Sequence, residues 1–144
     1  MLGFLFSLIA GAAMSFQGVM NTRLGDKVGV LETNVFVQGT GLVLALIIML
    51  IFGKGNLALL PQAPWYAWLG GLLAPVITVT VMLGMGMLNP LLAVSTILIA
   101  QLGVAALIDS LGWLGVTPAP FTWHKVVGLV LMCAGVVLMK LKSA

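Results

Sequence analysis

The chain has 144 residues, of which 62% are hydrophobic and only 6% are charged. A soluble domain carries about 25% charged residues, so this composition excludes one and predicts an integral membrane protein. The net charge of +3 is the balance of six dispersed basic and three acidic residues, which excludes nucleic acid as a partner because that needs a clustered basic face. Five crossings of about 20 residues would use most of the chain. We therefore expect an all-α fold, with residues 1–144 forming a single transmembrane domain.

The first predicted helix covers residues 1–20 and contains no charged side chain. Gln17 and Asn21 follow near its end and, being four residues apart, share one helical face. Two interpretations remain open for this pair, a hydrogen bond to a neighbouring helix or a role in lining a polar cavity. Residues 22–29 contain three charged side chains and are predicted to form a short aqueous loop.

The second predicted helix, residues 31–52, is polar in its first half and apolar from Leu42 onward. Because about 20 residues are needed to cross a ~30 Å hydrocarbon core, Glu32, Asn34 and Gln38 have to lie within the span or at its mouth. Polar side chains at this depth face a protein interior or a water-filled cavity. Glu32 is expected either to couple substrate movement to protonation or to act as a carboxylate at the helix amino terminus.

The third predicted helix, residues 65–87, is rich in helix breakers. Gly70 and Gly71 lie near its start, and Pro75 lies near mid-span. Proline removes one backbone donor and clashes with the carbonyl four residues earlier, so we expect a kink and a hinge between Gly71 and Pro75. The preceding connection, residues 53–64, contains two prolines and is predicted to be non-helical.

The fourth predicted helix, residues 91–113, carries Gln101 and Asp109, which lie on one face together with a small residue between them. Gln101 is a candidate for lining the cavity. Asp109 has two possible roles: it lines the same cavity, or it forms a salt bridge at the membrane surface with Lys125 or His124.

The fifth predicted helix, residues 121–139, has Gly128 and Gly135 one heptad apart on one side, a spacing that allows close helix packing. The chain has one cysteine, Cys133, and one histidine. That inventory provides neither a metal cluster nor a nucleophile–base pair, so no metal, no cofactor and no enzymatic activity are expected.

An odd number of crossings places the two termini on opposite sides of the membrane. Four basic residues fall on the side away from the amino terminus, namely Arg23, Lys27, Lys140 and Lys142. Two fall on the amino-terminal side, and so weak a bias is compatible with insertion in both orientations. All of the interfacial aromatic residues fall on the amino-terminal side: Trp65, Tyr66, Trp68, Trp113 and Trp123. An antiparallel pair would restore an aromatic belt at both interfaces, whereas a one-sided belt is the simpler alternative.

Several segments together carry a family resemblance. They are Ala100-Gln101-Leu102-Gly103, Leu107–Gly112, Gly128 and Gly135 in the second half, and Gln17, Asn21, Phe36 and Gly39 in the first. In this combination the chain resembles the YdcZ-like family of the drug/metabolite transporter superfamily. The resemblance implies an unfused five-helix unit in the bacterial inner membrane, which is half of a ten-helix inverted-repeat transporter. Such units exist as antiparallel homodimers, paired heterodimers or fused proteins.

Inverted repeats place a substrate site near the midplane, between the halves. We therefore expect a small-molecule transporter subunit that works by alternating access on a small, amphipathic or cationic substrate. The residues expected to border its cavity are Gln17, Asn21, Glu32, Asn34, Gln38, Gln101 and Asp109. A passive channel or a structural subunit is the alternative, although a scaffold has little need of polar side chains at membrane depth.

Overall fold

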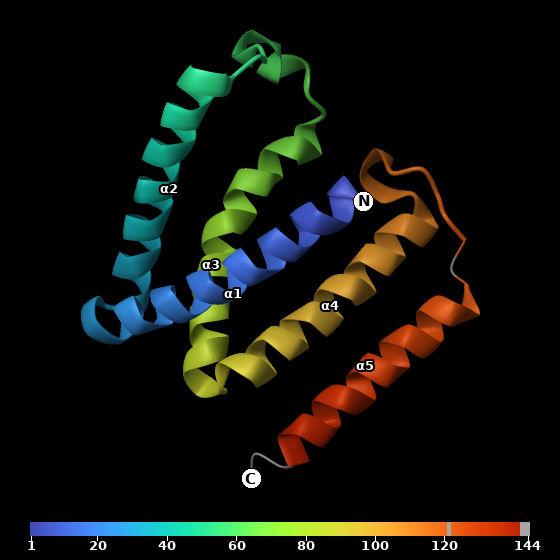
Figure 1. Ribbon diagram of the computed structural model, residues 1–144. Coiled ribbons are helices and arrows are strands. Elements are labelled where there is room, and N and C mark those ends of the chain that lie inside the picture. The colour runs from blue at the N-terminus through green and yellow to red at the C-terminus, as the bar shows by residue number, and fades with distance from the viewer. Residues whose placement is uncertain (121, 142–144) are drawn as a thin grey trace. The chain divides into compact units, whose positions relative to one another are not determined.

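The computed structural model describes residues 1–120 and 122–141, which form five long α-helices joined by short connections (Figure 1). The helices are α1 (Leu2–Val28), α2 (Val30–Phe52), α3 (Leu69–Met87), α4 (Pro90–Leu111) and α5 (Trp123–Leu141). Three 3₁₀ segments accompany them: η1 (Leu57–Gln62), η2 (Trp65–Trp68) and η3 (Trp113–Gly115). Within the described residues there is no strand, and five helical spans are long and apolar enough to cross a membrane. The all-α membrane fold is confirmed.

The chain divides by its internal contacts into two compact units, Met1–Met87 and Leu88–Ala144. In the first unit α1, α2 and α3 contact one another, and in the second α4 packs along α5. The boundary falls where Asn89 caps α4, because its side chain accepts a hydrogen bond of 2.9 Å from the backbone N–H of Leu92. Pro90 then occupies the first turn of the helix, where its missing N–H is tolerated.

The segment 22–29, expected to be an aqueous loop, is helical almost to its end, so that prediction was wrong. Charged residues do not stop a helix, and α1 ends only where the backbone turns at Gly29 (φ 103°). A side chain is strained at this φ, and a Cβ there would also collide with the Glu32 carboxylate. The N–H of Gly29 bonds the carbonyl of Gly25, and its carbonyl accepts from the N–H of Thr33, both at 3.0 Å. One residue therefore links α1 to α2.

The core of the first unit forms where α1 crosses α3. Gly18 lies against α3 so closely that a Cβ would come within 2.5 Å of the terminal methyl of Met85 and 3.2 Å of a Val81 methyl. A Cβ at Gly25, two turns later, would lie 3.6 Å from the Met82 sulfur, an ordinary van der Waals contact. Met82 and Met85 are buried at this contact. Glycine thus allows the two backbones to approach and the flexible methionines to fill the space between them.

The connection from α2 to α3 differs in part from expectation. α2 ends at Phe52, as predicted, with Gly53 as its C-cap. Residues 57–62, predicted to be non-helical, form the 3₁₀ segment η1 with Pro61 inside it. Asn56 starts η1 by accepting a hydrogen bond of 2.9 Å from the N–H of Ala58. A 3₁₀ segment of six residues tolerates proline where the interior of an α-helix would not, because it needs few backbone donors.

The connection from α4 to α5 is a loop, as expected, although α4 ends two residues earlier than residue 113. Gly112 terminates the helix in the left-handed conformation (φ 65°), and a Cβ there would come within 2.6 Å of Pro118. The loop folds back so that the N–H of Ala119 bonds the carbonyl of Asp109 at 2.8 Å. The loop therefore holds the end of α4 in place.

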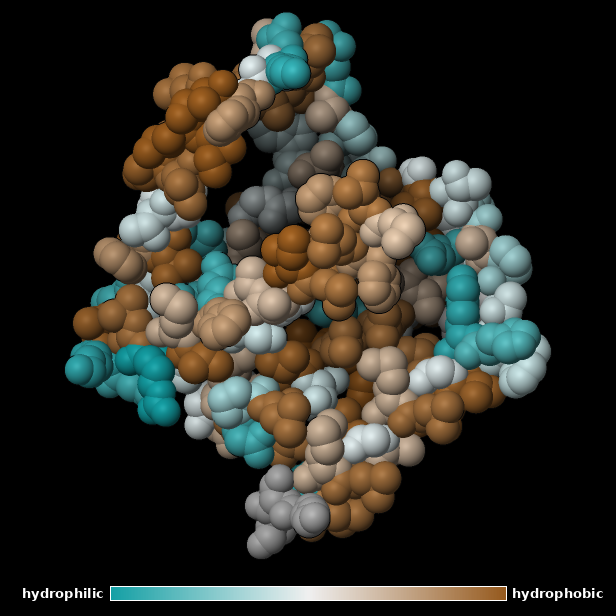
Figure 2. All heavy atoms as spheres, viewed as in Figure 1, coloured by the Kyte–Doolittle hydropathy of each residue, from teal (hydrophilic) through white to brown (hydrophobic). Residues whose placement is uncertain are grey.

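Large apolar side chains are exposed along every helix of the described chain. Figure 2 shows them over most of the visible face, with hydrophilic residues in small separate groups. An exposed apolar patch of more than a few hundred Å² would be unusual on a soluble monomer. Lipid or further protein has to cover this surface, which is what a multi-pass membrane protein requires.

Candidate substrate site

A polar contact joins α2 to α3 in the middle of the first unit. The Gln38 side-chain amide donates to the Thr78 hydroxyl at 3.3 Å and to the Asn34 side-chain oxygen at 3.4 Å. The Thr78 hydroxyl in turn donates to the carbonyl of Ala74 at 3.0 Å. The structure thus brings together two of the predicted cavity residues, Asn34 and Gln38, and adds Thr78, which sequence analysis missed.

This polar contact lies near the middle of both candidate membrane spans. The span of α2 is Val30–Phe52 and that of η2 with α3 is Trp65–Met87. Gln38 and Thr78 each lie within three residues of the middle of their span, which is about 5 Å or less along the helix axis. Both side chains are half-buried rather than enclosed. The contact therefore places hydrogen-bonding groups where lipid offers none.

Thr33, one residue before Asn34, is a second polar group that sequence analysis missed. It is completely buried (0% exposed), and within the described chain its hydroxyl has no hydrogen-bond partner. Leaving a buried hydroxyl unpaired is unfavourable by about 1–3 kcal/mol. The only signal in the sequence is a threonine beside other polar residues in an apolar helix, and that pattern is usually satisfied by the helix's own carbonyls, as it is for Thr40.

The remaining amides of the predicted cavity are not joined to this contact by any hydrogen bond within the described chain. Gln17 and Gln101 lie at the middle of α1 and α4 and are exposed, whereas Asn21 is half-buried. An exposed amide at the middle of a membrane span is unfavourable against lipid. Within the described residues, neither Gln17 nor Gln101 has a polar partner in its own unit.

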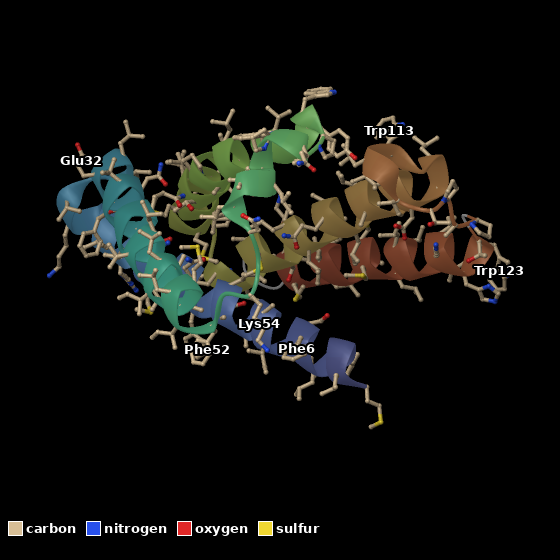
Figure 3. The ribbon with its side chains drawn as sticks, turned by 90° about the horizontal axis from the view of Figure 1, so that it is seen from above. Phe6, Glu32, Phe52, Lys54, Trp113 and Trp123 are labelled. Carbon is tan, nitrogen blue, oxygen red and sulfur yellow. The ribbon has the colours of Figure 1, made fainter. Side chains whose placement is uncertain are left out.

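Glu32 lies at the third position of α2, where the helix dipole favours a carboxylate. Its carboxylate folds back against Gly29, the residue that links α1 to α2. The side chain is exposed at this corner and points away from the helices (Figure 3). This position is compatible with the helix-terminal role, and both roles expected from the sequence stay predictions.

Asp109 lies in the last turn of α4 and shares an apolar groove of about 460 Å³ with Lys125, near the start of α5. The other lining residues are Leu102, Ala105, Ala106, Gly128, Leu129 and Met132. In the described chain the two charged groups line one groove without a direct ion pair between them. His124, the other expected partner of Asp109, instead stacks on Trp123 with ring centroids 4.0 Å apart.

Gly128 and Gly135 do not serve the close packing that their spacing predicted within this chain. A Cβ at either position would meet no other described group within 4 Å. Both glycines line hollows along the seam between α4 and α5. Their small size therefore opens space instead of closing it.

The predicted hinge residues lie in the first half of the third crossing, Trp65–Met87. Gly70 and Gly71 follow the change from the 3₁₀ segment η2 to α3, and α3 continues through Pro75 without interruption. Pro75 cannot donate to the carbonyl of Gly71. Thr78 bonds back to the carbonyl of Ala74 in the next turn, an arrangement that bends helices in membranes. The hinge stays a prediction, placed where the backbone hydrogen bonding of the crossing is weakest.

Comparison with known proteins supplies one match. The model of a family described as "Putative inner membrane exporter, YdcZ" matches residues 2–138. No match was found among curated proteins or among solved structures. In the described chain there is also no group of histidine, cysteine and acidic residues that could hold a metal ion.

Proposed function

Because the chain belongs to the YdcZ inner membrane exporter family, we propose that it is one half of a small-molecule exporter that works by alternating access in an antiparallel homodimer. The observation that carries this proposal is the hydrogen bond between Gln38 and Thr78 at mid-span. It ties two helices together through groups that remain half-exposed, so the same groups are available to a substrate. A scaffold would gain more from apolar packing there.

The exposed amides support the presence of a second copy of the chain beside the first. Gln17 and Gln101, like Gln38, each lie near the middle of their own span, but they have no partner group within the described chain. A second copy inverted in the membrane would bring its own mid-span amides to this depth, because the midplane is the one level that inversion leaves unchanged. The cavity between the copies would then be lined by amides and threonine hydroxyls, which suit a small amphipathic or cationic substrate.

The positions of two acidic residues at helix ends are compatible with an inverted pair. Glu32 lies at the start of α2 and Asp109 in the last turn of α4, so they belong to opposite membrane surfaces in one copy. In an inverted pair, Glu32 of one copy and Asp109 of the other lie at similar depths. Carboxylates at both membrane surfaces would raise the local concentration of a cation there without lining the cavity themselves.

Counterflow in proteoliposomes tests the proposal. We expect purified protein to exchange a radiolabelled lipophilic cation, such as tetraphenylphosphonium, against an unlabelled excess on the other side, with saturation. Gln38→Leu should reduce exchange at least about tenfold, whereas Gln62→Leu, which changes an exposed glutamine in η1, should not. Flux that does not saturate and shows no counterflow would identify a channel. Full exchange by the Gln38→Leu variant would show that transport does not need the contact between Gln38 and Thr78, and would contradict the proposal.

A further inference from the structure

A long furrow follows the seam between α4 and α5. Its wider part is the groove of about 460 Å³ that contains Asp109 and Lys125. A second hollow of about 210 Å³ adjoins it, because Met132 lines both. The residues around the second hollow are Ser95, Leu98, Met132, Gly135, Val136 and Met139.

The furrow is long enough for an acyl chain. Asp109 lies fourteen positions after Ser95 on α4, and Met139 lies fourteen positions after Lys125 on α5. At a rise of 1.5 Å per residue, the furrow is about 21 Å long. One leaflet of a hydrocarbon core of ~30 Å is about 15 Å deep. The furrow is therefore long enough to hold an acyl chain that spans one leaflet.

The two ends of the furrow differ in chemistry. Asp109 and Lys125 are the charged groups that line it, and they lie together at one end. The Ser95 hydroxyl, at the other end, is occupied by a 2.7 Å hydrogen bond to the carbonyl of Leu91. Every other lining side chain is apolar or small. The furrow thus has one polar end and an apolar body, as an amphiphile has.

The polar end lies at headgroup depth. Trp113 follows the end of α4 and Trp123 begins α5, and both are exposed at the same end of this unit (Figure 3). Tryptophan is enriched at the boundary between headgroups and hydrocarbon. Asp109 and Lys125 are within four residues of these side chains. Their charges therefore meet lipid headgroups, while the rest of the furrow descends among acyl chains.

We propose that this furrow binds one phospholipid whose headgroup carries a phosphate and a primary amine, as an ethanolamine headgroup does. Its phosphate accepts from the Lys125 ammonium, its amine donates to the Asp109 carboxylate, and one acyl chain lies along Gly128 and Gly135. The opposite charges at the polar end fit a zwitterion. An anionic glycerol headgroup is repelled by Asp109, and a choline headgroup has no N–H to donate to it.

Native mass spectrometry of the full chain, released from detergent with lipids of identical acyl chains, tests this site. We expect the ethanolamine lipid to bind about three- to fivefold more tightly than choline or glycerol lipids, the size of effect that one partly exposed ion pair gives. Asp109→Asn should abolish that preference while leaving acyl-chain binding in place. Lys125→Gln should weaken all three phospholipids and leave a neutral diacylglycerol unaffected.

Filling the furrow provides the matched control. Gly128→Leu and Gly135→Leu place side chains in the open space of the furrow and should displace all lipids from this site. Gly103→Leu makes the same change on α4 at a glycine outside the furrow, also with nothing within 4 Å, and should bind as the unmodified chain does. Asp109→Asn, which changes no volume, tests the headgroup independently should either leucine variant fail to fold.

Three outcomes would overturn the proposal: equal affinity for all headgroups, unchanged binding by both furrow-filling variants, or loss of self-association in those variants with lipid binding intact. The last result would mean that a second copy covers the seam. The site depends only on membrane insertion and not on the proposed transport function. Loss of counterflow with lipid preference intact would therefore refute the transport function alone.

Discussion

At the residue scale, the first unit is organised by a few polar side chains whose partners lie on other helices. Gln38 reaches Thr78 across α2 and α3, whereas Glu32 folds back on the start of its own helix. Both residues were predicted to border a cavity on the same argument, that a polar side chain in a membrane span avoids lipid. The structure separates them: Gln38 lies near mid-span, and Glu32 lies at an exposed corner.

The hydrogen bond between Gln38 and Thr78 should contribute measurably to stability. In a double-mutant cycle with Gln38→Leu and Thr78→Val, we expect a coupling free energy of about 0.6 kcal/mol and at most roughly 1.7 kcal/mol, the range for hydrogen bonds between membrane helices. Reversible unfolding in mixed micelles measures it. Strictly additive effects of the two substitutions would show that the contact carries no stability.

Glu32→Gln should leave transport and its pH dependence close to normal. The neutral amide keeps the size of the side chain but loses the charge that interacts with the α2 dipole, so we expect stability to fall by about 0.3–1 kcal/mol. Proteoliposome transport under an imposed pH gradient and micellar unfolding provide the two measurements. Asp26→Asn, on the exposed end of α1, is the control for losing one acidic charge. A folded Glu32→Gln protein that no longer responds to the gradient would establish Glu32 as the coupling residue.

At the scale of elements, two glycines decide how α1 is placed. Gly29 turns the chain directly into α2, and Gly18 lets α1 lie against α3. Other glycines of the same helix, such as Gly11, face open space. The role of a glycine in a membrane helix therefore depends on whether another helix packs against it.

Gly18→Leu should destabilise the first unit by about 1–3 kcal/mol, because the new side chain displaces Met85 and Val81 from a closely packed contact. Gly11→Leu is the matched control, since it lies on the same helix with nothing within 4 Å, and should change stability little. Unfolding free energies in mixed micelles compare the two. Equal effects of both substitutions would mean that the contact between α1 and α3 is absent from the membrane-embedded protein.

Pro75→Ala should slow transport more than it weakens substrate binding. Alanine restores a donor to the carbonyl of Gly71 and stiffens α3 between its start and Thr78. Pro61→Ala, in the exposed segment η1, is the control and should change neither quantity. Binding by equilibrium dialysis and rates by counterflow separate the two effects. Parallel losses of binding and rate would indicate misfolding and not a hinge.

At the scale of the whole molecule, five crossings leave the chain with its termini on opposite sides of the membrane. The described basic residues, together with Lys142, which lies outside the described residues, give only a weak bias toward one orientation. Extensive apolar surface and unpaired mid-span amides remain exposed. The proposed inverted second copy would account for the weak bias and for the amides together.

Cysteine labelling tests the antiparallel pair. In a Cys133→Ala background, single cysteines at Val28→Cys and Gly55→Cys lie at opposite ends of α2, and neither substitution changes the charge bias. In sealed vesicles, an impermeant thiol reagent should modify about half of each variant, because each orientation presents one end outward. Complete labelling of one variant and none of the other would show a fixed orientation and favour a separately encoded partner.

The sequence by itself determined that this is an all-α membrane protein with five crossings, because length and hydropathy set how often a chain spans a bilayer. It also located Asn34, Gln38, Gln101 and Gln17 at membrane depth, because depth follows from position along a helix. The one-residue turn at Gly29 could not be foreseen. Charged residues mark the end of a membrane span, but the helix itself can continue through them into water.

Only the tertiary structure decided which of these residues meet. The pairing of Gln38 with Thr78 depends on how α2 and α3 are rotated about their axes, and no sequence spacing encodes that rotation. The same holds for Gly128 and Gly135, whose heptad spacing indicates one face of α5 but not whether protein or open space lies opposite. Crossing geometry settles such contacts, because a given helix face becomes a packing surface, a polar contact or a furrow according to the neighbour placed against it.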